Sequence, residues 1–169
     1  MTEKPRITVQ VKYGEVEKTF SGSLEEIWLS IYRFFSEFIP SFEIAKKLTL
    51  SVDLQEITKE CEGLIAFSSE GANVLVPREK LTDNETLLLW LLASYVGFRL
   101  GLFGKENLSK DELQQKLGKN PKITSTRLGE LVKAGLVSKT AEDTYKITSA
   151  GLFQMRREII PRIRAKMNA

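Results

Sequence analysis

The apolar residues at the start of the chain follow the period of a β-strand. Residues 7–13 alternate apolar and polar side chains, which predicts a half-buried strand, and Gly14 ends the run. Residues 16–20 can return as the second strand of a hairpin, although the turn is not of the Asn-Gly type and leaves the register open. We therefore expect the chain to begin with a β-hairpin.

A helical period of apolar residues follows this hairpin. Ser23 and Glu26 have the spacing of a capping box, in which a hydroxyl and a carboxylate satisfy free backbone amides at a helix start. Pro40 lacks an amide hydrogen and disfavours helical geometry in the preceding residue, so the helix should end near Phe38. Its apolar residues recur at helical spacing and predict one broad core-facing stripe. They are Leu24, Ile27, Trp28, Ile31, Phe34, Phe35 and Phe38.

Two further short helices and a second hairpin are expected next. Residues 41–47 predict one helix, and residues 53–61 predict another with Cys61 on its buried side. Short apolar runs at residues 64–67 and 73–76 then predict a hairpin with a connection of four or five residues.

A long apolar run occupies residues 87–103. At roughly 17 residues it is about the shortest segment that can cross a bilayer, and its flanks carry no one-sided basic charge. A helix that is apolar all round is also what the centre of a globular domain contains. We therefore expect a buried central helix, which begins after a capping turn at residues 83–85 and ends near residues 101–104.

The pattern after the long helix predicts two short helices joined by a tight turn. Ser109 and Glu112 repeat the capping-box spacing and open a helix that Gly118 ends. Residues 119–122 form the turn, and a second helix runs over residues 123–134.

A small hairpin and a last helix complete the chain. Residues 136–139 and 144–147 predict two strands around a polar turn at residues 140–143. A strongly basic amphipathic helix begins near Gly151, and we expect it to bend at Pro161. Its arginines either contact an anionic partner or form the solubilising face of a terminal helix.

The stretch from Thr126 to Val137, followed by Tyr145-Lys146-Ile147-Thr148 and Gly151, resembles a known domain family. It looks like the winged-helix DNA-binding domains of small bacterial and archaeal transcription regulators of the ArsR and MarR type. The resemblance implies an α+β fold in which a C-terminal winged helix-turn-helix, residues 83–169, follows a small α/β N-terminal unit, residues 1–82.

The N-terminal unit has a second interpretation. Residues 62–65 faintly echo residues 134–137, and helices followed by a hairpin have a winged-helix order of their own. The unit is then a degenerate second winged helix with an extra β-hairpin.

The resemblance also implies a set of DNA contacts. A recognition helix at residues 123–134 would enter the major groove with its first residues nearest the bases. Hydroxyls and amides there suit phosphate oxygens, and an arginine can pair with guanine through two hydrogen bonds. The residues expected to contact DNA are Lys119, Lys122, Thr124, Ser125, Thr126, Arg127, Lys133, Lys139 and Lys146. Three acidic residues depart from this pattern, since Glu142 and Asp143 lie at the expected wing tip and Glu130 lies on the helix, where phosphates would repel them.

Charge is distributed unevenly along the chain. Residues 1–104 contain eleven Lys and Arg against fifteen Asp and Glu, a balance of −4, whereas residues 105–169 contain fourteen against seven, a balance of +7. Such asymmetry favours a polyanionic partner for the C-terminal part, although a solvated basic face has the same composition.

Composition excludes several function classes. The chain has no histidine and a single cysteine, so no disulfide forms within it and the usual nitrogen and sulfur metal ligands are almost absent. Its serines have no histidine to activate them, and no glycine-rich phosphate loop follows a predicted strand. We expect no enzyme activity, no metal and no cofactor. The first residues do not look like a secretory signal, which predicts a cytoplasmic protein.

Three functions remain in order of preference. The first is a DNA-binding transcription regulator that binds double-stranded DNA as a homodimer, because two-fold symmetric operators match two-fold symmetric proteins. The second is a non-catalytic subunit of a larger assembly that uses its winged helix to bind protein or RNA. The third is an enzyme with an unfamiliar site in the N-terminal unit.

Overall fold

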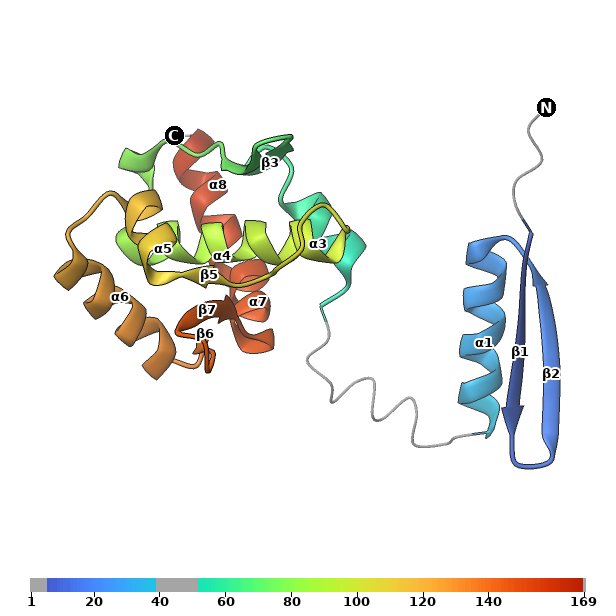
Figure 1. Ribbon diagram of the computed structural model, residues 1–169. Helices are drawn as coiled ribbons and strands as arrows, with labels where there is room; N and C mark the ends of the chain where they lie inside the picture. Colours follow the sequence, from blue (N-terminus) through green and yellow to red (C-terminus); the bar gives the residue numbers. More distant parts are fainter. Residues whose placement is uncertain (1–5, 39–51, 169) are drawn as a thin grey trace. The chain divides into compact units, whose positions relative to one another are not determined.

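The computed structural model, shown in Figure 1, describes residues 6–38 and 52–168. Contacts divide the chain into a first unit, Met1–Thr49, and a second unit, Leu50–Ala169. The described residues are mixed α+β with small antiparallel sheets, as the sequence predicts. The division falls earlier than the expected boundary at residues 82 and 83, because residues 54–76 pack on the long helix that follows them.

The first unit contains a hairpin and a helix. Strands β1 (Ile7–Tyr13) and β2 (Val16–Gly22) are antiparallel, with Tyr13 opposite Val16, which sets the register that the sequence left open. Helix α1 (Leu24–Phe38) begins with the predicted capping box. The Ser23 amide donates to Glu26 Oε2 at 2.8 Å, and the Glu26 amide donates to Ser23 Oγ at 3.3 Å.

Only part of the predicted apolar stripe of α1 is buried. Ile27 and Phe34 are buried, and the Phe34 ring meets Phe20 of the hairpin edge to face. Leu24 and Trp28 are 68% and 72% exposed, so their assignment to the core is wrong. Two strands spaced about 4.8 Å apart cover a narrow strip of a helix, which leaves the edge of a broad stripe in solvent. The Phe38 side chain and the helix predicted at residues 41–47 lie outside the described residues.

The second unit begins with a helix and a hairpin. Helix α3 (Leu54–Glu60) is capped by Asp53 and ends at Cys61, which is buried as predicted. Strands β3 (Ile65–Ser68) and β4 (Gly71–Val74) pair with Ser68 opposite Gly71. The connection is therefore a two-residue turn, shorter than expected, because Gly71 adopts a φ of 127° that lets the chain reverse tightly.

The echo between residues 62–65 and 134–137 corresponds to a local likeness in structure. Gly63 follows α3 with a φ of 75° and precedes the β3–β4 hairpin, and Gly135 has a φ of 74° between a helix and the last hairpin of the chain. Each glycine ends a helix in the left-handed conformation that L side chains avoid. The likeness is limited to this helix, glycine and hairpin.

Helix α4 (Asp83–Arg99) is the centre of the second unit. It follows a single 3-10 turn, η1 (Arg78–Lys80), and its N-cap is Thr82, one residue before the predicted capping turn. Its leucines are buried on every side, which confirms the buried-helix prediction. Across the described part of the chain, no helix is both long and apolar enough to span a bilayer.

Two short helices and a three-stranded sheet pack against α4. Strand β5 (Leu108–Ser109) leads into α5 (Lys110–Leu117), which is followed by α6 (Pro121–Lys133), β6 (Val137–Lys139) and β7 (Thr144–Ile147). The sheet is antiparallel in the order β5-β7-β6. Helix α6 starts two residues before its predicted start, because Asn120 caps it and proline at its first position needs no amide partner.

The last helix is interrupted by a π-helical turn just before Pro161, where the sequence predicted a bend. Helix α7 (Ser149–Gln154) passes into a π-helical turn, η2 (Met155–Ile159), before α8 (Ile160–Asn168). The Ile160 amide donates to the Met155 carbonyl five residues back, so the hydrogen-bond ladder widens just before Pro161. Met155, Ile159 and Ile163 are buried in the core that contains α4.

Candidate nucleic-acid interface

Helix α6 has one buried and one exposed face. Thr124, Leu128 and Leu131 are buried at positions four and three residues apart. The opposite face, which recurs at the same period, is exposed and contains Lys122, Ser125, Thr126, Gly129 and Lys133. The face of α6 that packs on the core therefore determines which of the residues predicted to contact DNA are exposed.

Thr124 does not reach solvent. It is 0% exposed, and its hydroxyl donates to the Asn120 carbonyl at 3.1 Å. Its predicted contact with DNA is therefore wrong, because it lies on the same stripe as the core leucines. Ser125 and Thr126 are exposed but donate to the Pro121 and Lys122 carbonyls, at 2.8 and 3.0 Å. Each of these two hydroxyls must rotate before it can donate to a phosphate oxygen.

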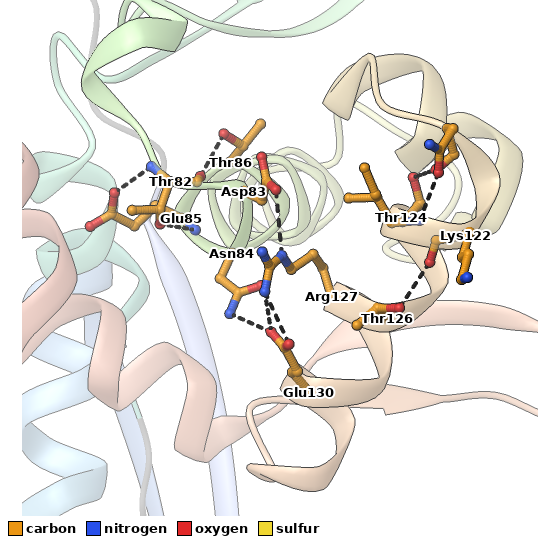
Figure 2. A network of polar contacts seen from close by, with 12 residues as sticks. Thr82, Asp83, Asn84, Glu85, Thr86, Lys122, Thr124, Thr126, Arg127 and Glu130 are labelled. Carbon is orange, nitrogen blue, oxygen red and sulfur yellow. Dashed lines mark hydrogen bonds and ion pairs between the residues drawn. The ribbon is translucent and has the colours of Figure 1, made fainter.

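Arg127 is turned toward the start of α4, as Figure 2 shows. Its Nε lies 3.4 Å from Asp83 Oδ2, and its Nη1 lies 3.0 Å from Glu130 Oε1. Asn84 Nδ2 donates to Glu130 Oε2 at 3.2 Å and completes the cluster. The bonds from Asn84 and Arg127 hold the pKa of Glu130 below its usual value. The positive charge predicted to read guanine is thus neutralised by two carboxylates.

The cations of the last hairpin are also paired with acids. Lys139 Nζ lies 2.5 Å from Asp143 Oδ1 across the turn, and Lys146 Nζ lies 2.9 Å from Glu106 Oε1. The hydrogen bond from Lys139 lowers the pKa of the Asp143 carboxyl. Both predicted contacts are on the surface, but neither carries an uncompensated charge.

Three predicted cations remain free on and beside α6. Lys119, Lys122 and Lys133 are exposed, and within the ranges the structure describes none has a carboxylate at ion-pair distance. Lys122 points away from the acidic cluster around Arg127 (Figure 2). Lys133 is eleven positions after Lys122, which places the two about 16 Å apart along the helix axis. Lys122 and Lys133 therefore put uncompensated positive charge at both ends of the exposed face, and Lys119 adds a third charge just before the helix.

The sequence did not predict a groove between α6 and the last hairpin. It has a volume of about 340 Å³, and its walls include Lys110, Ser125, Gly129 and Tyr145. Lys110 is the first residue of α5, so the groove joins both short helices to the hairpin. The signal available in the sequence was Gly129, an unusual residue for the middle of a helix.

Gly129→Ala is expected to raise the free energy of unfolding by about 0.5–1 kcal/mol. A Cβ at this position meets nothing within 4 Å, so alanine gains helix propensity without a steric cost. Urea denaturation of the two proteins measures the change. A destabilised variant would show that the groove closes over Gly129 in solution.

The basic last helix holds the second unit together. Arg156 forms ion pairs with Glu56 and Glu60 of α3, each with a shortest distance of 2.9 Å. Arg164 Nη2 donates to the carbonyls of Glu60 and Glu62 at 2.8 Å. Arg156 and Arg164 therefore tie the last helix to α3 and the residues after it, a role within the fold that is neither of the two left open by the sequence.

Other chemistry has little support in the described residues. Over residues 6–38 and 52–168 no group of three acidic or cysteine side chains is placed to hold a metal ion. Burial raises the pKa of the Cys61 thiol to about 12, so it stays protonated and is a poor nucleophile.

Comparisons of the chain with protein-family models, with curated proteins and with solved structures find no match.

Proposed function

We propose that residues 83–147 form a winged helix and that the exposed face of α6 binds the phosphate backbone of double-stranded DNA. The observation that carries this proposal is the set of three free lysines, two on α6 and one just before it, on a helix that is followed by a two-stranded hairpin. The order α4-β5-α5-α6-β6-β7, with the sheet order β5-β7-β6, supports a winged helix. In this arrangement α6 lies in the major groove and the β6–β7 hairpin is the wing.

The proposed binding depends more on the positive charge of α6 than on the base sequence of the DNA. Phosphate contacts position a protein on DNA, whereas contacts to base edges provide specificity. Lys119, Lys122 and Lys133 can contact phosphates, but Arg127 must leave Asp83 and Glu130 before it can reach a base. We therefore expect a DNA-binding regulator with a modest preference among sequences, whose specificity on a palindromic site comes from pairing as a homodimer.

We expect DNA affinity to fall steeply as salt rises. Three phosphate contacts give a slope of about −2.7 in log affinity against log salt, or about 40-fold weaker binding between about 50 and 200 mM salt. Fluorescence anisotropy with a labelled random-sequence duplex measures this slope. Lys119→Gln, Lys122→Gln and Lys133→Gln should each reduce its magnitude by about 0.9.

Lys59→Gln is the matched control for these variants. Lys59 is an exposed lysine on α3 and lies in the same unit, so its substitution removes the same charge without touching α6. It should leave both affinity and salt slope unchanged. Binding that is absent at about 50 mM salt, or equal losses in all four variants, would refute the proposed interface.

The paired charges of the hairpin support a second candidate function. Lys139 and Lys146 are neutralised by Asp143 and Glu106, and Glu142 is exposed beside them. A wing without free positive charge is better suited to a protein surface than to phosphates. A winged-helix subunit that binds a protein partner would retain that partner in high salt and would not depend on Lys122.

A further inference from the structure

A cavity of about 460 Å³ lies beside α4, on the side where α5, β4 and the loop after α4 meet. Its volume is within the range of sites that hold small organic molecules, roughly 300–1,000 Å³. All of its lining residues belong to the second unit. None of the three free lysines on and beside α6 lines it.

The apolar wall of this cavity is built from Trp90, Phe103 and Leu108. Phe103 rests directly on the backbone of α4, because a Cβ at Gly97 would lie 2.2 Å from its ring. The ring also meets Phe67 of β3 edge to face, with centroids 5.6 Å apart. These two contacts fix the position of the Phe103 ring in the cavity wall beside α4.

Ser94 supplies a hydroxyl without a partner. It lines the cavity and is only 6% exposed, and it lies one helical turn from Trp90 on α4. In the described part of the chain its hydroxyl makes no hydrogen bond. Because this hydroxyl has no partner among the described residues and lines the cavity, it is available to a polar group of a molecule bound there.

Lys116 supplies an uncompensated cation at the same cavity. Its Nζ lies 3.7 Å from the centroid of the Trp90 ring, and among described residues no carboxylate lies within ion-pair distance. The nearest acid in sequence, Glu112, is held by Lys105 at 3.2 Å and by the Ser109 amide at 2.7 Å. Burial lowers the pKa of Lys116, against the opposing effect of Glu112, as expected for a cation that lacks a close counter-ion.

We propose that this cavity binds a small monocarboxylic acid, with its apolar body against Trp90 and Phe103 and its carboxylate on Lys116 and Ser94. The single unpaired cation among the described residues that line the cavity, Lys116, matches the single negative charge of a carboxylate. Glu112 is paired with Lys105, but Glu70 also lines the cavity, and its charge would repel a phosphate dianion more strongly than a monocarboxylate. The proposal is independent of the nucleic-acid function, since it uses none of the residues of the α6 face.

The test compares phenylpropionate with its neutral amide. The chain has two tryptophans, so Trp28→Phe, a change at an exposed position, leaves Trp90 as the only tryptophan reporter. Phenylpropionate should change Trp90 emission saturably, and the amide should bind at least about tenfold more weakly, because it lacks the charge that Lys116 meets. Both probes act on the same protein, so this comparison does not depend on how a cavity variant folds.

Two variants test whether the carboxylate of the bound acid lies on Lys116 and Ser94. Lys116→Met keeps the apolar stem and should remove the difference between acid and amide, and Ser94→Ala should weaken the acid several-fold. Lys59→Met, at an exposed position on α3 outside the cavity, should preserve the difference. Equal binding of acid and amide, or no saturable change with either, would overturn the proposal.

Discussion

Replacing Glu85 by glutamine is expected to lower the free energy of unfolding by about 2 kcal/mol, because it weakens charged hydrogen bonds to two cations that remain partly in solvent. The Glu85 side chain is 3% exposed and joins the start of α4 to α8, with its oxygens 2.9 Å from Arg162 Nε and 2.9 Å from Lys166 Nζ. It also accepts from the Thr82 amide at 2.8 Å as the acid of the capping box. Glutamine keeps the shape of the side chain but removes the charge that these two cations require.

The effect of this substitution should depend on pH. Burial opposes ionisation of Glu85, but the Thr82 amide, Lys166 and Arg162 outweigh it and hold the pKa of its carboxyl below 4.5 in the folded protein. A lowered folded pKa means that the stabilisation is complete above the unfolded pKa and is lost as pH falls through the folded pKa. The difference between wild type and Glu85→Gln should therefore be largest near neutral pH and shrink in acid.

Urea denaturation at neutral and acidic pH, followed by Trp90 emission in a Trp28→Phe background, measures both effects. Glu79→Gln is the control, since Glu79 is exposed on η1 and lies in the same unit. It should change the stability by less than about 0.5 kcal/mol at either pH. A Glu85→Gln protein as stable as this control would show that α8 does not dock on the start of α4.

The features predicted correctly from sequence are those set by neighbours in the chain. The capping boxes Ser23/Glu26 and Ser109/Glu112 are confirmed because each depends on groups three residues apart. Hairpin strands and the buried character of α4 follow from local apolar patterns. The start of α6 was missed although Asn120 is an N-cap residue, since the proline after it was interpreted as part of a turn.

The candidate site was less predictable because it depends on residues far apart in sequence. Arg127 lies 44 residues from Asp83, and Arg156 lies 96 residues from Glu60. No sequence periodicity indicates that such groups meet. Basic residues that form ion pairs within the fold therefore cannot be told apart in the sequence from basic residues without a partner. Exposure of Thr124 likewise depends on the phase of α6 against its neighbours, which a one-residue shift would change.

The cavity beside α4 left only a faint signal in the sequence. Ser94 is a polar residue in the buried part of α4, and it lies four residues after the amphipathic Trp90 on one helix face. Lys116 reaches that face from α5, whose orientation follows from packing rather than from local pattern. A polar residue inside a buried helix was therefore the clue to a second site.

Gly151→Ala is expected to lower the free energy of unfolding by about 2–3 kcal/mol, opposite in sign to Gly129→Ala. A Cβ at Gly151 would lie 2.2 Å from the Leu136 carbonyl oxygen and 2.8 Å from Ile147 Cγ1. The Leu136 carbonyl accepts from the Thr148 amide at 3.0 Å, so it cannot move away without loss of that bond. The Gly151 amide also donates to Thr148 Oγ1 at 3.0 Å, which ties the start of α7 to the same contact.

Gly129→Ala and Gly151→Ala together separate the effect of steric packing at a glycine from the effect of helix propensity. Helix propensity alone favours alanine over glycine by about 1 kcal/mol at both helical positions. Opposite signs in urea denaturation can arise only if α7 docks closely on the backbone that leads into the β6–β7 hairpin, while the exposed face of α6 remains open. Stabilisation by both substitutions would contradict the docking of α7, because backbone atoms at 2.2 Å leave no room for a methyl group.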